Sequence, residues 1–272
     1  MYNFLTSNSI IKLISIYSFH FMLKISSVFI LSILCLLFCF SCKTAHTNDN
    51  DVENSIKKIN YLALGDSYTI GESVKISERY PIQLVKEIEF LSKNNTKNKD
   101  RVYFEEPQII AKTGWTCEEL MTAIHLAEQK KDFKPNYDMV SLLIGVNDQY
   151  RNYDSALYEK RFEKLLEKAI AFAGKDASKV FVISIPDWGV TQYAKNKKFD
   201  AQKVAKEIDF YNKINKKITL KHKVRYFDIT SISREAVSDK NLIANDGLHP
   251  SGKMYKRWVE LMTNDIFWEI LK

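Results

Sequence analysis

Short apolar runs, each ended by glycine, proline or small polar residues, recur five times after residue 58. Runs of this length that stop at a turn are typical of buried strands in a parallel sheet. We therefore predict five strands, over residues 59–64, 108–111, 139–144, 180–185 and 224–229.

Apolar residues at helical spacing lie between and after these runs. One stripe follows Pro81, and Thr116 with Glu119 forms a capping-box pattern before another. Asp154 is placed to cap a third helix. Further stripes consist of Val204, Ile208, Tyr211, Ile214 and Ile218, and of Met254, Trp258, Leu261 and Met262. Strands that alternate with helices predict an α/β domain, with a parallel sheet covered on both faces.

The first 41 residues have a different character. They contain no acidic residue, and 28–40 is almost wholly apolar, which is typical of a signal peptide and too short for a membrane span. Met22 is an alternative start, because Met22-Leu23-Lys24 would itself provide a charged beginning. Residues 42–58 are polar and predict a flexible tether, so we expect the folded domain to cover 59–272.

Cys42 ends the apolar leader in a pattern that resembles a bacterial lipoprotein cleavage site, although Cys39 stands where such sites usually carry Leu. We expect lipidation at Cys42 and export to the cell envelope. The alternative is an ordinary secretory signal, which leaves a periplasmic or secreted protein.

Cysteine count and charge exclude several classes of protein. Of the four cysteines only Cys117 lies in the predicted domain, so neither an internal disulfide nor a cysteine metal site can form there. Loss of residues 1–41, which hold two lysines and no acid, lowers the formal charge from +7 to +5. This surplus is spread over helices and loops, so we expect no nucleic-acid partner.

Residues with catalytic chemistry follow successive strands. Ser67 comes after the first, Gly114 after the second and Asn147 after the third, whereas Asp246 and His249 precede the last helix. A serine hydroxyl needs a neighbouring base, and the base needs a partner for its second nitrogen. Ligands of open α/β sheets bind at the carboxyl ends of the strands. The loops that carry these residues, which we call the corners, are expected to meet at that edge.

Each of these sequence features, taken alone, is weak evidence for catalysis. Gly-Asp-Ser is more often a plain turn or cap, and an isolated Asp-x-x-His is more often a hydrogen-bonded loop. Asp187 also ends a strand and is a second candidate partner for His249. We expect Asp66 and Asp148 to bind loop backbones and hold the corners in place.

The order of these residues resembles that of the SGNH, or GDSL-type, serine hydrolases. The matching blocks are Gly65-Asp66-Ser67, Gly114, Gly145-Val146-Asn147-Asp148 and Asp246-Gly247-Leu248-His249. The resemblance covers the chain from Ile59 onward. Thr69 replaces the second glycine of the G-x-S-x-G elbow, so the chain does not fit the α/β-hydrolase pattern.

The resemblance implies a three-layer, flavodoxin-like fold and a hydrolase without metal or cofactor. It implies that Ser67 is the nucleophile, His249 the general acid and base, and Asp246 its partner. It also implies an oxyanion hole made by the Ser67 and Gly114 backbone N–H groups and the Asn147 side chain.

We therefore expect an enzyme that cleaves carboxylic esters, with short acyl or acetyl groups and carbohydrate O-acetyl esters as one substrate class. Tyr68, Trp115 and Trp188 lie next to the corners and are candidates for substrate subsites. A lysophospholipase or thioesterase fits the motifs equally well. A non-catalytic surface lipoprotein that binds a glycan or lipid is the alternative outside enzymes. The acyl group, the leaving alcohol and the oligomeric state do not follow from the sequence.

Overall fold

The computed structural model describes residues 56–95, 101–131 and 133–272. The signal peptide, the two possible starts and Cys42 lie outside this part of the chain, so those assignments stay predictions. Within the described residues, no helix is both long and apolar enough to cross a membrane.

A five-stranded sheet forms the centre of the domain, in the order β4-β2-β5-β6-β7 with every neighbouring pair parallel. Its strands are β2 (Tyr61–Gly65), β4 (Gln108–Ala111), β5 (Met139–Leu143), β6 (Val180–Ile183) and β7 (Arg225–Phe227). All five predicted strands are present. Numbered along the chain, this order is 2-1-3-4-5, the flavodoxin-like arrangement. The strand order reverses between β2 and β5, which is where ligands of such sheets bind.

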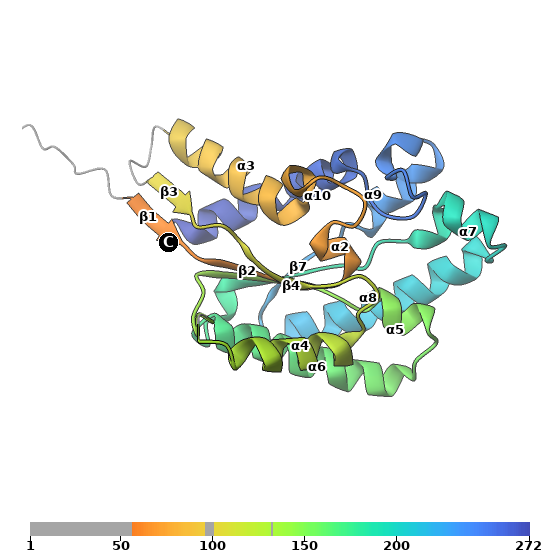
Figure 1. Ribbon diagram of the computed structural model, residues 1–272, viewed down its shortest axis with the longest axis horizontal. Helices are drawn as coiled ribbons and strands as arrows, with labels where there is room; N and C mark the ends of the chain where they lie inside the picture. Colours follow the sequence, from red (N-terminus) through yellow and green to blue (C-terminus); the bar gives the residue numbers. More distant parts are fainter. Residues whose placement is uncertain (1–55, 96–100, 132) are drawn as a thin grey trace, which may run out of the picture. The chain divides into compact units, whose positions relative to one another are not determined.

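Helices cover both faces of this sheet (Figure 1). Helices α3 (Tyr80–Asn94) and α10 (Gly252–Ile270) pack together on one face, near α9 (Thr230–Arg234). The other face carries α4 (Cys117–Glu128), α6 (Ser155–Phe172) and α8 (Ala201–Lys221). Short helices follow the strand ends: α2 (Ser67–Ile70), α5 (Val146–Tyr150) and α7 (Gln192–Asn196). The predicted three-layer α/β/α fold is confirmed.

Sequence signals at helix ends account for several boundaries. The Thr116 hydroxyl accepts the Glu119 N–H, and the Glu119 carboxylate accepts the Thr116 N–H, so the capping box is complete. Asp154 caps α6 through the Leu157 N–H at 2.8 Å. The stripe on α8 is buried as predicted, whereas Leu261 on α10 is 47% exposed and does not belong to the core.

A second, two-stranded parallel sheet pairs β1 (Ile56–Ile59) with β3 (Arg101–Phe104). The prediction that the tether extends to residue 58 is therefore wrong for its last three residues, which belong to β1. Only one side chain of β1, that of Ile59, is buried. The strand is held by pairing with β3, whose own backbone is fixed to α3 through the 2.7 Å bond from the Val102 N–H to Ser92 Oγ.

Candidate active site

The candidate nucleophile, Ser67, is the first residue of α2 and lies at the carboxyl end of β2. A Cβ atom on Gly65 would lie 2.1 Å from Thr69 Oγ1, so only glycine fits at this turn. Asp66 caps the helix, because its Oδ1 accepts the Tyr68 N–H at 3.0 Å. As the first residue of a helix, Ser67 has a backbone N–H without an acceptor inside that helix. Ser67 therefore combines a hydroxyl with a backbone donor.

The last helix fixes this turn from the other end of the domain. The Tyr255 hydroxyl on α10 donates to the backbone carbonyl of Tyr68 at 3.0 Å, and the tyrosine is fully buried. The position of the nucleophile thus depends on packing between the first and last parts of the domain.

His249 and Asp246 form the pair expected of a base and its partner. His249 Nδ1 lies 2.6 Å from Asp246 Oδ2, which leaves Nε2 for the pocket. Asp246 Oδ1 accepts the backbone N–H groups of Leu248 at 2.9 Å and His249 at 3.0 Å. Partial burial alone would raise the pKa of Asp246, but the hydrogen bonds from His249, Leu248 and Ser73 lower it to about 2. Asp246 is therefore ionised wherever the enzyme would work.

Asp187, the second candidate partner for His249, is engaged elsewhere. Its Oδ2 accepts Arg234 Nε at 2.8 Å, and its Oδ1 accepts the Gly189 N–H at 2.9 Å. The carboxylate thus caps the short helix that follows β6 and pairs with α9. It does not hold the histidine.

Gly114 and Asn147 supply candidate oxyanion donors from the ends of β4 and β5. Gly114 has φ +87°, a left-handed conformation that favours glycine. Asn147 Nδ2 donates to the Trp115 carbonyl at 2.9 Å. An amide nitrogen carries two hydrogens, so Asn147 can hold this loop and still offer one hydrogen to a substrate oxygen.

These groups converge on a single cavity of about 160 Å³ at the carboxyl edge of the sheet. Its walls are mostly aromatic or apolar, which lowers the effective dielectric around the polar groups. It is lined by Ser67, Tyr68, Thr113, Gly114, Val146, Asn147, Tyr150, Trp188, Tyr193, Leu248 and His249. The structure therefore joins Ser67, Gly114, Asn147 and His249, which the sequence places at four separate corners.

The three predicted subsite residues have different positions. Tyr68 lines the cavity, with its ring centroid 5.5 Å from that of His249. Trp188 also lines it but is only 4% exposed, and its Nε1 donates to Gln149 Oε1 at 2.8 Å. Trp188 is thus a wall of the pocket. Trp115 does not line the cavity and is partly buried against the core, so its contact with substrate stays a prediction.

Two aromatic residues of the pocket, Tyr150 and Tyr193, do not follow from the motifs. Their hydroxyls lie 3.1 Å apart, and Tyr150 packs edge-on against Trp188 with ring centroids 5.4 Å apart. Each follows a strand end, Tyr150 on α5 and Tyr193 on α7, and that position is the signal that could have found them.

Asp66 and Asp148 accept backbone N–H groups, as the sequence predicts, but these groups belong to the first turns of α2 and α4 and not to loops. Asp148 Oδ2 accepts the Cys117 N–H at 3.0 Å and so joins α5 to α4. Both carboxylates are fully buried, and each has one oxygen without a hydrogen-bond partner. Burial raises the pKa of Asp66 to about 8 and that of Asp148 to about 6. These acids therefore differ from Asp246, whose charge is stabilised.

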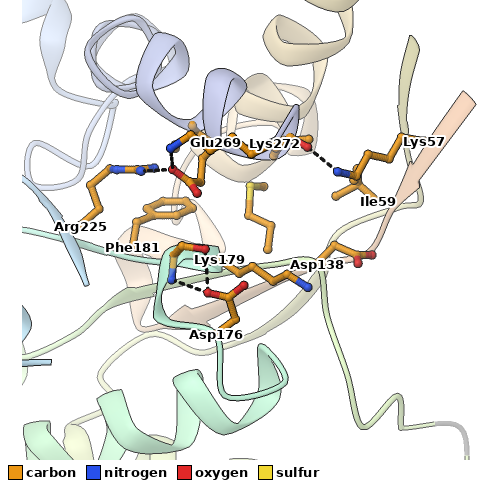
Figure 2. Close-up of a pocket in the computed structure, with 13 residues that line it drawn as sticks. Lys57, Ile59, Asp138, Asp176, Lys179, Phe181, Arg225, Glu269 and Lys272 are labelled. Carbon is orange, nitrogen blue, oxygen red and sulfur yellow. Dashed lines mark hydrogen bonds and ion pairs between the residues drawn. The ribbon is translucent and has the colours of Figure 1, made fainter. Parts of the chain in front are cut away.

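A larger cavity, of about 330 Å³, lies at the opposite, amino edge of the sheet (Figure 2). Several of its charged groups bind one another or the backbone. Glu269 accepts Arg225 at 2.7 Å and Lys272 at 2.9 Å, whereas Lys57 Nζ donates to the Ile270 carbonyl. None of the motif residues lines this cavity.

One group of metal-type ligands occurs within the described residues, formed by Glu163, Glu167 and His222. Glu163 Oε1 already accepts Lys221 Nζ at 2.8 Å and lies 2.8 Å from His222 Nε2. These residues are on α6 and at the end of α8, and none of them lines the cavity that holds Ser67.

Comparison with solved structures shows the same fold. A family 3 carbohydrate esterase from Clostridium thermocellum is 20% identical, with a TM-score of 0.56 over 78% of this chain and 98% of that one. The psychrotrophic esterase EstA from Pseudoalteromonas is 15% identical, with a TM-score of 0.53 over 76% and 96%. An acetyl-xylooligosaccharide esterase from Geobacillus is 18% identical, with a TM-score of 0.50 over 78% and 94%.

No curated protein matches the chain. The model of the GDSL-like Lipase/Acylhydrolase family, however, matches residues 63–257, which include every motif block quoted above. The chain therefore belongs to the GDSL-like lipase/acylhydrolase family, and it is a carboxylic ester hydrolase of the SGNH type.

Proposed function

We propose that this enzyme hydrolyses esters of short acyl groups, acetyl esters of carbohydrates above all, through an acyl-enzyme on Ser67. The observation that carries the proposal is the convergence of Ser67, Gly114, Asn147 and His249 on one small cavity. Asp246, which holds the other nitrogen of His249, completes the arrangement.

In the first half of the reaction, His249 Nε2 takes the Ser67 proton while Oγ attacks the ester carbonyl. Negative charge develops on the carbonyl oxygen, where the Ser67 and Gly114 N–H groups and the Asn147 amide donate to it. Asp246 stabilises the imidazolium that forms. His249 then protonates the leaving alcohol, and the acyl group stays on Ser67.

In the second half, water attacks the acyl-enzyme and gives its proton to His249. The same donors stabilise the second oxyanion, and Ser67 leaves with the proton returned by His249. All groups required for both halves come from this chain.

The size of the cavity supports a short acyl group. At about 160 Å³, the cavity that holds Ser67 is small, which favours a short acyl group over a long hydrocarbon chain. The walls formed by Tyr68, Tyr150, Trp188 and Tyr193 restrict it further.

A neighbouring cavity of about 570 Å³ gives room for a bulky alcohol. Gly247 lines this second cavity, and its carbonyl accepts the N–H of Tyr193, which lines the first one, at 2.9 Å. The two spaces therefore adjoin across the Asp246–His249 loop. Two of the solved structures with this fold are carbohydrate or acetyl-xylooligosaccharide esterases, which supports a sugar in the alcohol position.

Ser67→Ala tests the mechanism. We expect turnover of nitrophenyl acetate to fall by roughly 10⁴-fold or more, because the bond-forming atom is gone. A serine-directed phosphonate should label the wild type at Ser67 and leave the variant unlabelled. Ser77→Ala, at an exposed serine further along the same segment, is the matched control. Full activity in Ser67→Ala would exclude the proposed nucleophile.

The substrate class is tested with the wild type on acetylated xylo-oligosaccharides, lysophospholipids and acyl thioesters, and on nitrophenyl esters of increasing chain length. We expect kcat/KM to be highest for acetyl and to fall with chain length. If activity is highest on a long-chain lysolipid or on a thioester, the enzyme is a lysophospholipase or a thioesterase instead.

A further inference from the structure

The Asp246 carboxylate receives one hydrogen bond from a distant part of the chain. Ser73 Oγ donates to Asp246 Oδ2 at 2.7 Å, across 173 positions of sequence. The same oxygen lies 2.6 Å from His249 Nδ1, so the serine and the histidine share one acceptor. Because an ionised carboxylate only accepts hydrogen bonds, the hydroxyl must be the donor.

Ser73 belongs to the segment that carries the nucleophile. Two backbone bonds close the turn after α2, from the Glu72 N–H to the Ser67 carbonyl at 3.0 Å and from the Val74 N–H to the Gly71 carbonyl at 3.4 Å. The segment that leaves Ser67 therefore turns back and touches the residue that orients the base.

The conformation of Ser73 is unusual for a serine. Its φ is +65°, in the left-handed region where glycine or asparagine is more common. Gly71, two residues earlier, has φ +68°, which an ordinary side chain would adopt only with strain. A serine at such a position is worth a functional explanation, and the hydroxyl contact with Asp246 provides one.

We propose that Ser73 is a positioning residue for the catalytic pair and acts through Asp246. Its hydroxyl holds Oδ2 in place for His249 Nδ1 and takes up part of the electron density of that oxygen. It also couples the turn that carries the nucleophile to the loop that carries the base. This inference rests on the proposed function, since it assigns Asp246 the role of partner to a histidine base.

The alternative is that the Ser73–Asp246 contact is an ordinary surface hydrogen bond that only stabilises a loop. Both residues are exposed, so water can replace the hydroxyl when it is removed. If water does so without consequence, Ser73 has no role in the reaction. The two explanations differ in what they predict for pH dependence.

Other titratable groups near Asp246 and His249 do not account for a difference in pH dependence between the wild type and a Ser73 variant. Burial raises the pKa of Tyr68 and Tyr255, both of which also feel the charge of Asp246. Asp66 and Asp187 are the other carboxylates that act on Tyr68. All four are common to the wild type and a Ser73 variant, so their contributions cancel in the comparison.

The test measures kcat/KM from about pH 5 to 9 for the wild type, Ser73→Ala and Ser73→Gly, with Ser77→Ala as control. We expect both Ser73 variants to lose roughly three- to tenfold at the plateau, the range of one ordinary hydrogen bond. We also expect the acid limb to move upward by a few tenths of a pH unit, because Oδ2 without Ser73 holds the imidazolium more strongly. Ser73→Gly separates the hydroxyl from the backbone, since glycine suits φ +65°.

Two results would overturn the proposal. One is a plateau and an acid limb that match the wild type. The other is full activity in Ser73→Gly beside a defect in Ser73→Ala, because the defect would then arise from backbone strain. Thermal unfolding of each variant shows whether the fold is intact.

A second measurement is independent of turnover. The chemical-shift titration of the His249 ring by NMR should have a higher midpoint in Ser73→Ala than in the wild type, and the same midpoint in Ser73→Ala/Asp246→Asn as in Asp246→Asn. A shift that persists without the Asp246 carboxylate would show that Ser73 acts by another route. Since the titration needs no substrate, failure of the proposed function and failure of this inference remain distinguishable.

Discussion

The two ends of the central sheet carry cavities of opposite character. The one at the amino edge is about twice as large, and seven of its thirteen lining residues are charged. The one at the carboxyl edge is lined mainly by aromatic and small residues, with His249 as its titratable base. By the charge of its lining alone, the amino edge would be the natural candidate for a site.

The difference lies in how the polar groups are used. At the amino edge, Glu269 binds both Arg225 and Lys272, and Lys57 donates to the Ile270 carbonyl, so these charges are engaged within the fold. At the carboxyl edge, the polar side chains of the cavity are held by groups that do not line it. The Trp115 carbonyl accepts a hydrogen bond from Asn147, and the Asp246 carboxylate binds His249. A polar side chain that the protein holds in place, with an atom still free to face the cavity, can act on a substrate. Charges that are paired with one another stabilise the fold instead.

Loss of an oxyanion donor is the strongest of three tests of this contrast. Asn147→Ala should lower kcat by roughly 10²- to 10³-fold, the usual effect of removing one such donor. Asn136→Ala, on an exposed loop, is the control. Steady-state kinetics with nitrophenyl acetate measure both, and an Asn147→Ala rate within a few fold of wild type would remove the amide from the oxyanion hole.

The buried acid beside the nucleophile gives a pH test. The pKa of Asp66 is about 8 in the folded protein and near 3.9 in an unfolded chain, so between these values only the native state holds the proton. Stability from this group is therefore complete below about pH 4 and is lost as pH rises through 8. We expect the free energy of unfolding to fall, on the order of a few kcal/mol, between about pH 5 and 9.

Asp66→Asn should flatten that dependence, because the amide keeps the oxygen that caps α2 and cannot ionise. Urea unfolding at about pH 5, 7 and 9 compares the two proteins. Asp176→Asn is the control from the amino edge, where bonds from Ser178 lower the pKa of Asp176. An equal pH slope in the wild type and Asp66→Asn would show that Asp66 is already ionised.

The smallest effect is expected at the amino edge itself. Lys179→Ala alters the charge of the larger cavity at an exposed position. We expect kcat/KM for nitrophenyl acetate to stay within about twofold of wild type, since no group that lines the larger cavity also lines the carboxyl-edge one. A loss of about tenfold in kcat/KM would show that the amino edge affects catalysis at the carboxyl edge.

Much of the fold and the site follows from the sequence, because the signals are local. The five strands are apolar runs that end at turns, and the caps at Thr116 and Asp154 use residues three positions apart. Ser67, Gly114 and Asn147 could be placed in one site because parallel strands bring their carboxyl ends to the same edge. Asp246 and His249 are close in sequence, so their contact could be predicted as well.

The features that could not be predicted depend on packing between distant residues. Strand β1 has one buried side chain and exists through pairing with β3, a strand far along the chain. The Tyr150–Tyr193 pair joins two short helices, and the Ser73–Asp246 bond spans most of the domain. The direction of the Trp115 side chain does not follow from its position after a glycine either, because packing against the core decides it.

The bond from Tyr255 to the Tyr68 carbonyl has a consequence for the timing of activity during synthesis. The turn that carries Ser67 is made early, but its anchor is on α10, and the base lies just before that helix. A nascent polypeptide therefore lacks a complete hydrolytic centre until α10 has left the ribosome. Reactivity is acquired only when the whole domain has been translated, which keeps partly made chains inert.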